Sequence, residues 1–233
     1  MRVVGVLLAL IVLMSTNTCA QHSEIRKADS IAKLYPGHSL NDLGLLSFKL
    51  TSPLKTEVGK FRAIYKWVCS NIEADLSLVQ INKRKRAKLA GEDLSRWNKK
   101  FNIRMVRILV AEQRTLCTGY AWLVRELALC AGIDCEIVNG YGKTTRTNIN
   151  GKPNLNHSWN AVRLQDQWYL CDPTWGSGAV NPATGKYIRN FSERYFMSDP
   201  YEFIKNHYPL DEKWTLLSDP PTFETFLDLT PPR

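Results

Sequence analysis

The segment from His157 to Trp175 is unusually rich in side chains that can perform chemistry. Its sequence, HSWNAVRLQDQWYLCDPTW, contains one His, one Cys, two Asp and three Trp in nineteen residues. A His that is paired with a carboxylate can accept and return a proton, and the carboxylate fixes the tautomer of the ring. Such a pair activates a nucleophile for acyl transfer. We therefore consider His157 and Asp172 as two parts of a catalytic site whose nucleophile lies elsewhere in the chain.

Cys117 is the candidate nucleophile because it lies at the predicted start of a helix. The residues after it form an apolar stripe at helical spacing, made of Tyr120, Ala121, Val124, Leu127 and Ala128. Free N–H groups and the dipole at a helix start stabilise a thiolate. An isolated Cys is more often a small buried apolar residue. The prediction for Cys117 therefore depends on the His and the carboxylate that can serve it.

The chain on either side of Gln165-Asp166 alternates as two strands of a hairpin would. If those two residues alone form the turn, Trp159 pairs with Asp172. His157 and Asp172 then lie on the same face of the sheet, one diagonal step apart. A four-residue turn preserves this arrangement, whereas a three-residue turn places them on opposite faces. On the two-residue register Cys171 points away from the site.

Helical patterns fill the first half of the chain, and strand patterns follow. The predicted helices are 23–35, 55–72, 103–113 and the one starting near Cys117, and the predicted strands are 134–142, 157–164 and 168–172. This order indicates an α+β fold, with the nucleophile-bearing helix packed on an antiparallel sheet. We predict one domain after a leader at residues 1–20. Residues 21–100 form its N-terminal helical segment, and residues 101–233 form its catalytic core with a C-terminal extension.

Three blocks resemble the transglutaminase-like superfamily of papain-type thiol enzymes: KFRAIYKWVCSNI, LCTGYAWLVRELALCAGIDCEIVNGYG and NHSWNAVRLQDQWYLCDPTWGSG. The later block YFMSDPYEFIKNHYPLDEKWTLL is similar to the branch that contains the kyphoscoliosis peptidases. The resemblance implies a papain-like fold. It also implies that Cys117 is the nucleophile, His157 the general base and acid, and Asp172 the orienting carboxylate.

Two positions depart from the pattern of that family. Thr115 stands where the family usually has Gly, and Ala74 stands where an aromatic residue often precedes the Asp of NIEAD. Because Thr115 is close to the nucleophile in sequence, we expect it to alter the approach of the substrate. Neither departure removes a catalytic atom.

Other residues receive supporting roles. The backbone N–H of Cys117 and one further donor would bind the oxyanion, and Gln113 is a candidate for that donor. Trp159 and Trp175 are expected to line the cleft. Two histidines beside Pro-containing turns are expected to be surface or packing residues: His38 and His207. No cofactor or metal is predicted, because Cys130 and Cys135 lack the second ligand pair that a zinc site needs.

The first residues predict an export signal. Met1-Arg2 is followed by an apolar run, residues 3–14, and by small residues up to Ala20. The run is shorter than the roughly 20 residues that span a bilayer, so no transmembrane segment is predicted. Cleavage near Ala20 would release a secreted or periplasmic protein. Lipid attachment at Cys19 is the alternative, although residues 16–18 make a poor lipoprotein signal.

Charge and cysteine content add two expectations. The chain carries a net charge of +9, much of it in residues 82–88 and 96–100. These residues form either a solvated helix face or a surface for an anionic partner, such as an acidic protein or a cell-wall polymer. Export argues against nucleic acid. Five cysteines follow the leader, and an odd number leaves at least one without an intramolecular disulfide partner in an oxidising compartment. A Cys130–Cys135 disulfide is left open.

The leading hypothesis is an exported thiol acyl-transfer enzyme that acts on peptide or glutamine-type amides through a thioester. Release by water would make it a peptidase or deamidase, and release by an amine would make it a cross-linking transglutaminase. The resemblance of the C-terminal block favours hydrolysis. A binding or scaffold module of the cell envelope without turnover is the alternative from another class, because a fold does not fix a function.

Overall fold

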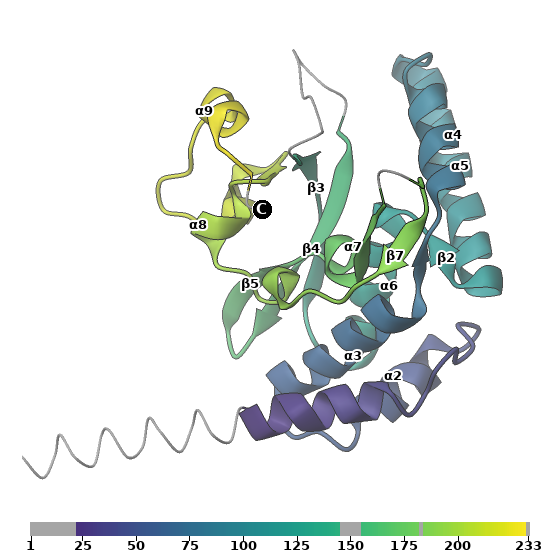
Figure 1. Ribbon diagram of the computed structural model, residues 1–233, viewed down its shortest axis with the longest axis vertical. Coiled ribbons are helices and arrows are strands. Elements are labelled where there is room, and N and C mark those ends of the chain that lie inside the picture. Colours follow the sequence, from purple (N-terminus) through teal and green to yellow (C-terminus); the bar gives the residue numbers. More distant parts are fainter. Residues whose placement is uncertain (1–21, 145–154, 182–183, 232–233) are drawn as a thin grey trace, which may run out of the picture.

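Helices gather around one antiparallel sheet in the computed structural model, which describes residues 22–144, 155–181 and 184–231 (Figure 1). The helical front comprises residues 22–32, α2 (Leu43–Thr51), α3 (Glu57–Asn71), α4 (Leu76–Arg86), α5 (Gly91–Glu112) and α6 (Cys117–Cys130). The predicted export signal lies outside the described residues. Within the described ranges, no helix is long and apolar enough to cross a membrane.

The main sheet has four strands in the order β5-β4-β3-β8, and neighbouring strands are antiparallel. Its strands are β3 (Cys135–Gly142), β4 (His157–Leu164), β5 (Gln167–Cys171) and β8 (His207–Pro209). The first three follow α6 directly, whereas β8 comes from the C-terminal extension and pairs with β3. The predicted α+β class, with helices before an antiparallel sheet, is confirmed.

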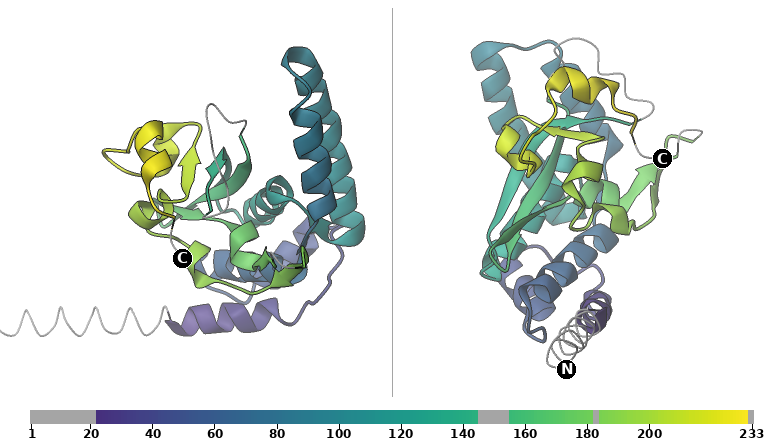
Figure 2. Two further views of the ribbon diagram at one scale, coloured as in Figure 1. Left: turned by 45° about the horizontal axis from the view of Figure 1, so that its top comes forward. Right: turned by 90° about the vertical axis from the view of Figure 1, so that its left-hand side faces the viewer.

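Short elements join and cover this framework. Two small sheets are formed by β1 (Glu73–Ala74) with β2 (Arg114–Thr115) and by β6 (Gly178–Val180) with β7 (Tyr187–Arg189). Single-turn helices complete the second half: α7 (Pro173–Ser177), η1 (Glu193–Tyr195), α8 (Pro200–Phe203), η2 (Glu212–Thr215) and α9 (Phe223–Asp228). The extension from α8 to α9 lies at the β3 side of the sheet, to which it adds the edge strand β8 (Figure 2).

The largest apolar cluster lies between α3, α6 and one face of the sheet. Four apolar residues of α3 are fully buried in this cluster: Phe61, Ile64, Tyr65 and Val68. Removing such side chains from water stabilises the fold by about 1.5–3 kcal/mol each. Together they hold the helix that begins at Cys117 in a fixed place against β4.

The hairpin register agrees with the two-residue prediction. Leu164 pairs with Gln167, and the turn residues Gln165 and Asp166 have positive φ angles of 52° and 65°. Two successive positive φ angles are the feature of a type I′ turn, whose twist matches that of the strands it joins. Because the side-chain period of a strand is two, this turn fixes which face each following residue occupies.

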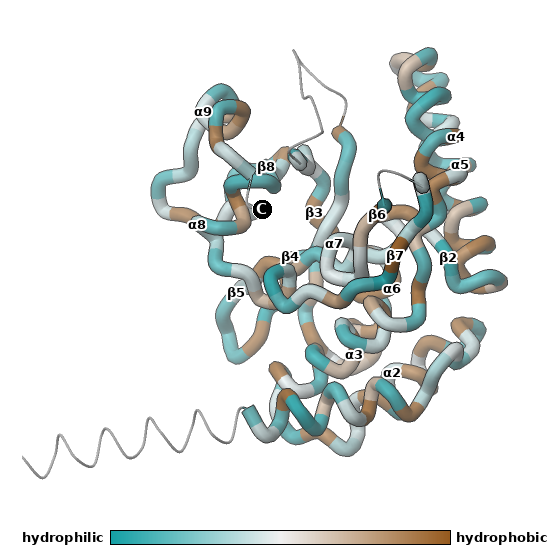
Figure 3. The backbone as a smooth tube through the Cα atoms, viewed as in Figure 1, coloured by the Kyte–Doolittle hydropathy of each residue, from teal (hydrophilic) through white to brown (hydrophobic). Residues whose placement is uncertain are grey.

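Helices α4 and α5 form a pair that projects away from the rest of the molecule (Figures 1 and 2). The pair is mostly hydrophilic (Figure 3), and its apolar residues, including Phe101 and Met105, pack with Leu116 near the start of α6. The predicted division between residues 100 and 101 falls inside α5. The N-terminal helical segment and the core therefore share this helix.

A parallel bridge between β1 and β2 positions the start of α6. Asp75 N donates to the carbonyl of Thr115 at 2.7 Å, which ties the end of α3 to the residues just before Cys117. The side chain of Thr115 is fully buried against Gly119. It therefore does not lie in the path of a substrate, and our expectation for Thr115 is wrong because the bridge turns this side chain under the helix.

The contact between Thr115 and Gly119 predicts strong coupling between the two positions. A Cβ at Gly119 would lie 1.9 Å from Thr115 Oγ1. Gly119→Ala should therefore lower the free energy of unfolding by about 1–3 kcal/mol, the usual cost of overpacking. In Thr115→Gly, which removes the clashing atoms, the same Gly119→Ala change should cost much less. Denaturant unfolding of the four proteins of this cycle measures the difference, and equal costs in both backgrounds would refute the contact.

Candidate active site

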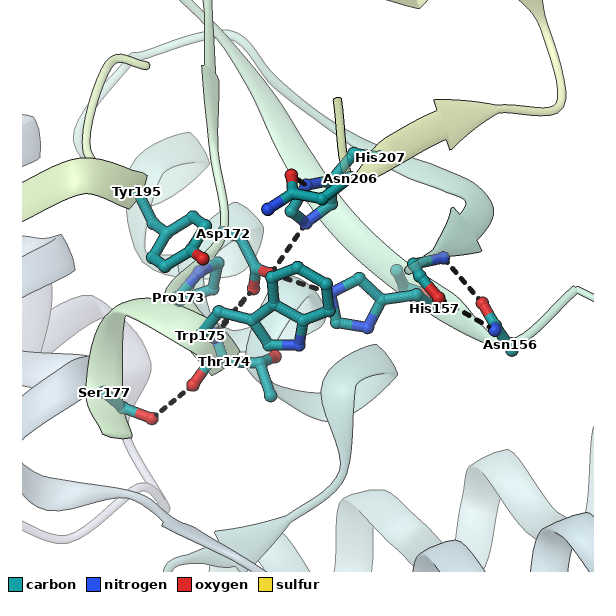
Figure 4. Close-up of polar contacts among 12 residues, drawn as sticks. Asn156, His157, Asp172, Pro173, Thr174, Trp175, Ser177, Tyr195, Asn206 and His207 are labelled. Carbon is teal, nitrogen blue, oxygen red and sulfur yellow. Dashed lines mark hydrogen bonds and ion pairs between the residues drawn. The ribbon is translucent and has the colours of Figure 1, made fainter. Parts of the chain in front are cut away.

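Asp172 is the most constrained side chain of the site. It is 0% exposed and stands at the N-cap of α7, with Pro173 at the first helical position. Its Oδ1 accepts hydrogen bonds from the backbone N–H groups of Thr174 at 2.8 Å and Trp175 at 3.1 Å (Figure 4). An N-cap carboxylate satisfies the free donors of a helix start in this way. One carboxylate oxygen is thus committed to the backbone.

The second oxygen of Asp172 lies between two histidines. Oδ2 is 2.7 Å from His157 Nε2 and 3.0 Å from His207 Nε2 (Figure 4). Burial alone would raise the pKa of Asp172, but the charge and hydrogen bond of His157 and the hydrogen bond of His207 hold that pKa well below its usual range. Asp172 is therefore a charged group with four hydrogen-bond donors in the protein interior.

Helix α3 fixes the backbone at this corner. The hydroxyl of Tyr65 donates to the carbonyls of Asp172 at 2.9 Å and Tyr195 at 2.8 Å. Gly176 allows this approach, since a Cβ there would lie 2.1 Å from the hydroxyl oxygen. Cys69 Sγ donates to the carbonyl of Pro173 at 3.4 Å. The orientation of Asp172 thus depends on a helix more than a hundred residues earlier in the chain.

His157 is held by its neighbours in the orientation that meets Asp172. Its ring stacks on Trp175 with centroids 4.8 Å apart and an interplanar angle of 25° (Figure 4). Gly142 on the paired strand runs close to it, where an added Cβ would lie 3.0 Å from His157 Cγ. Because Nε2 is engaged with Asp172, Nδ1 is the ring nitrogen left for Cys117.

Cys117 is the first residue of α6, and no side chain caps this helix start. The residue is half-buried, and its thiol is influenced by hydrogen bonding from the His157 side chain and from the backbone N–H of Ser158. Burial would raise the pKa of the thiol, but these bonds and the charge of His157 lower it. For His157, burial would lower the pKa, yet Asp172 and Cys117 raise it to about 10. These opposite shifts favour a thiolate–imidazolium pair.

The other cysteines differ from Cys117 in their surroundings. In the part of the chain that the structure describes, all five cysteines are free thiols, so the disulfide left open between Cys130 and Cys135 is not formed. Burial raises the pKa of three thiols, those of Cys69, Cys135 and Cys171. Cys171 packs into the main apolar cluster, away from the site, as its strand position predicts.

Two predicted supporting roles are wrong. The side-chain amide of Gln113 donates to the carbonyl of His38 at 2.7 Å, so its N–H is engaged outside the site and does not serve an oxyanion. Gln113 ends α5 with a positive φ of 51°, and this turn directs its side chain. Trp159 is 0% exposed and packs against Phe203, so it is a core residue and not a cleft wall. Trp175 is half-buried and stacks on His157, and its role as a cleft wall stays a prediction.

His207 is the site residue that the sequence prediction missed. It is 1% exposed and bonded to Asp172, so it is neither a surface residue nor only a packing residue. Its chain neighbours gave no local sign of this role.

His207, Asp172 and His157 also place ligand atoms within 4.8 Å of one another, close enough to hold a metal ion. The distances of 2.7 and 3.0 Å to one shared oxygen are those of N–H···O hydrogen bonds, which already account for the arrangement.

Comparisons with known proteins show what this chain is similar to. Residues 46–173 match the model of the Transglutaminase-like superfamily. The human kyphoscoliosis peptidase is 33% identical over 175 residues, which cover 73% of this chain and 24% of the human protein. Hillarin from Drosophila melanogaster is 32% identical over 124 residues, covering 48% of this chain and 15% of Hillarin. A solved structure described as a TGase has a TM-score of 0.40 and 17% identity, and the match covers 73% of this chain and 36% of that chain.

The match to kyphoscoliosis peptidase thus spans about a quarter of that protein's length. The family model, in contrast, covers more than half of this chain. The matched residues include the three catalytic residues that we predict from the sequence of this chain: Cys117, His157 and Asp172. On this evidence the chain belongs to the transglutaminase-like superfamily.

Proposed function

We propose that this protein is a thiol hydrolase that cleaves peptide or glutamine-type amide bonds through Cys117. One observation carries the proposal: Cys117 begins a helix, and His157, which lowers the pKa of its thiol, meets the buried carboxylate of Asp172 through Nε2. A nucleophile, a base and an orienting acceptor in this order are what acyl transfer requires. The names of relatives, such as kyphoscoliosis peptidase, support the same class of reaction.

The reaction would proceed in two steps. The thiolate of Cys117 attacks the amide carbonyl carbon, and the backbone N–H of Cys117 binds the resulting oxyanion. The imidazolium of His157 gives its proton to the nitrogen as the C–N bond breaks, which releases an amine and leaves a thioester. Water then attacks the thioester while His157 accepts a proton from it. The carboxylic acid departs, and the thiolate and imidazolium are restored.

The acyl acceptor is part of the proposal. We favour water because the C-terminal block resembles the kyphoscoliosis-peptidase branch and a relative is named a peptidase. An amine acceptor would make the protein a cross-linking enzyme, and absence of turnover would make it a binding module. We further propose that residues 1–20 direct export, which would place the reaction outside the cytoplasm.

The basic hairpin, defined as residues 76–112, is proposed to recruit an acidic protein substrate. It contains ten Lys and Arg but only three Asp and Glu, a net +7 of the +9 of the whole chain. Its far end is exposed, including Lys83, Arg84, Lys85 and Lys88. A concentrated charge on a projecting element attracts oppositely charged chains and speeds their encounter. The apolar base of this hairpin packs with the start of α6.

The first test of the proposal is the reactivity of Cys117. Its pKa is lowered, and His157 stays protonated until the pH approaches about 10, so the thiolate–imidazolium pair should persist across neutral pH. Iodoacetamide should therefore label Cys117 rapidly at pH 7. In His157→Ala burial would remain as the main influence on the thiol, and burial raises the pKa of Cys117. Labelling of Cys117 at pH 7 should therefore fall at least about tenfold.

The measurement is the labelling rate of each cysteine peptide by mass spectrometry between pH 5 and 10. Exposed Cys130 is an internal reference thiol, and its rate should be equal in wild type and His157→Ala. Slow labelling of Cys117 in the wild-type protein, at the rate of Cys130 or below, would contradict the proposed nucleophile.

Asp172→Asn tests whether the carboxylate takes part in turnover. An Asn can keep its oxygen on the N–H groups of α7 but must turn its NH₂ toward the histidines. This would force His157 to place its proton on Nδ1, facing Cys117, where it cannot act as a base. Turnover of a peptide amide selected from a library should fall by up to roughly 10⁴-fold, the loss that an Asp-to-Asn exchange causes in Ser-His-Asp triads.

The matched control for this variant is Asp166→Asn in the hairpin turn, where the side chain is 91% exposed and Asn suits a type I′ turn. This control should keep wild-type turnover. Thermal unfolding of both proteins separates loss of function from loss of fold. If Asp172→Asn retains most of the activity, or if it is unfolded, Asp172 is a structural residue and the mechanism is wrong.

The recruitment proposal predicts a charge-dependent affinity. Replacing Lys83, Arg84, Lys85 and Lys88 with Ala should weaken binding of polyglutamate by about tenfold or more at low salt, since exposed charges contribute up to about 1 kcal/mol each. A control removes four exposed basic residues elsewhere: Arg26, Lys33, Lys55 and Lys186. Fluorescence anisotropy at several salt concentrations measures both. Equal weakening in the two variants would assign the effect to net charge and not to the hairpin.

A further inference from the structure

We propose that His207 is a positioning residue of the active site, supplied by the C-terminal extension, whose ring N–H holds Asp172 aligned on His157. The proposal rests on the proposed function, because it concerns how the same site is kept in order. Residues 46–173 match the family model, and His207 lies beyond them. The extension is therefore proposed to complete the site and not merely to cover the sheet.

The position of His207 is fixed by strand pairing. It begins β8, where it pairs with Gly142 of β3, and Pro209 pairs with Gly140. The neighbouring residue Asn206 accepts a backbone hydrogen bond from Lys143 at 2.8 Å. His207 therefore enters the site from the edge of the same sheet that carries His157 on β4, and from the side opposite to β5.

Aromatic rings hold the side chain of His207 in one orientation. It stacks on Phe203 with centroids 3.9 Å apart and an angle of 14°, and Trp175 lies 4.4 Å away. Trp159 meets it edge-on at 5.1 Å. A ring packed in this way cannot rotate without opening the cluster. The 3.0 Å contact between Nε2 and Asp172 Oδ2 is thus imposed by the packing.

The protonation state of His207 follows from the groups that face it. The titratable groups around the ring are Asp172, His157 and Tyr195. One carboxylate cannot neutralise two imidazolium rings 5.3 Å apart in a buried site. Burial, despite the opposing effect of Asp172, lowers the pKa of His207 to about 4, so the ring is neutral at neutral pH.

A neutral ring carries one proton, and the carboxylate can only accept, so that proton belongs on Nε2. The structure places the amide oxygen Oδ1 of Asn206 against His207 Nδ1. A proton on Nε2 therefore requires this amide to be reversed, so that its NH₂ donates to Nδ1. In this state His207 gives Oδ2 a second donor without adding a charge. The carboxylate cannot rotate away from His157 while both bonds are present.

The tautomer is testable without any substrate. The chain has only four histidines, so ¹⁵N-histidine NMR spectra can be assigned by single substitutions. His207 should give the neutral Nε2–H tautomer from pH 6 to pH 9 without titrating. An Nδ1–H tautomer, or titration of His207 with an ordinary pKa near 6.5, would overturn the proposal.

Two variants separate the donor from the packing. His207→Phe keeps an aromatic ring against Phe203 but removes the N–H, whereas His207→Gln restores an N–H donor. We expect Cys117 labelling by iodoacetamide at pH 7 to fall about ten- to a hundredfold in His207→Phe, the loss of one hydrogen bond to a charged group. In His207→Gln at least part of the rate should return. His38→Phe, the same exchange outside the site, should label like wild type.

The outcomes distinguish this proposal from the proposed function. If wild-type Cys117 is unreactive, the proposed function fails. If wild-type Cys117 is reactive and a folded His207→Phe labels at the same rate, only the role of His207 fails. If His207→Phe does not fold, the tautomer and the pH response in the wild-type spectra still decide the proposal.

Discussion

The buried carboxylate of Asp172 is the constraint on which the rest of the site depends. A charge in the interior is tolerated only when its lone pairs are filled, because leaving one donor out costs several kcal/mol. Here the donors come from α7, from β4 and from β8, and the backbone carbonyl of the same residue is held by Tyr65 of α3. The charged form of Asp172 is therefore stable only when these four distant segments have folded around it.

The charge of Asp172 in turn affects the protonation of His157 and of Cys117. Asp172 raises the pKa of His157, and His157 lowers the pKa of Cys117. When the three groups are ionised, their charges alternate in sign. Each charge is then stabilised by the opposite charge beside it. Cys69 shows the contrast, because it is buried close to the same carboxylate without a cationic partner of comparable effect, and its pKa is raised. The difference between a reactive and an inert thiol lies in the neighbours.

Local patterns in the sequence predicted the parts of this site that depend on period and turn type. The start of α6 at Cys117 and the pairing that brings His157 to Asp172 follow from a 3.6-residue stripe and a two-residue turn. Side-chain directions at irregular positions were not predictable in this way. Gln113 turns away because α5 ends in a left-handed residue, and Thr115 turns inward because β1 pairs with β2.

The role of His207 could not be predicted from local pattern, because it depends on a strand pairing across sixty-five residues, Gly142 with His207. Two glycines of β3, Gly140 and Gly142, nevertheless indicate how closely β8 and His157 approach this strand. A Cβ at Gly140 would lie 2.2 Å from the Tyr208 carbonyl oxygen, and one at Gly142 would lie 3.0 Å from the His157 side chain. Only a strand without side chains at these two points lets β8 and His157 approach from opposite sides. The glycines of β3 thus belong to the site as spacers, although neither carries a group that reacts.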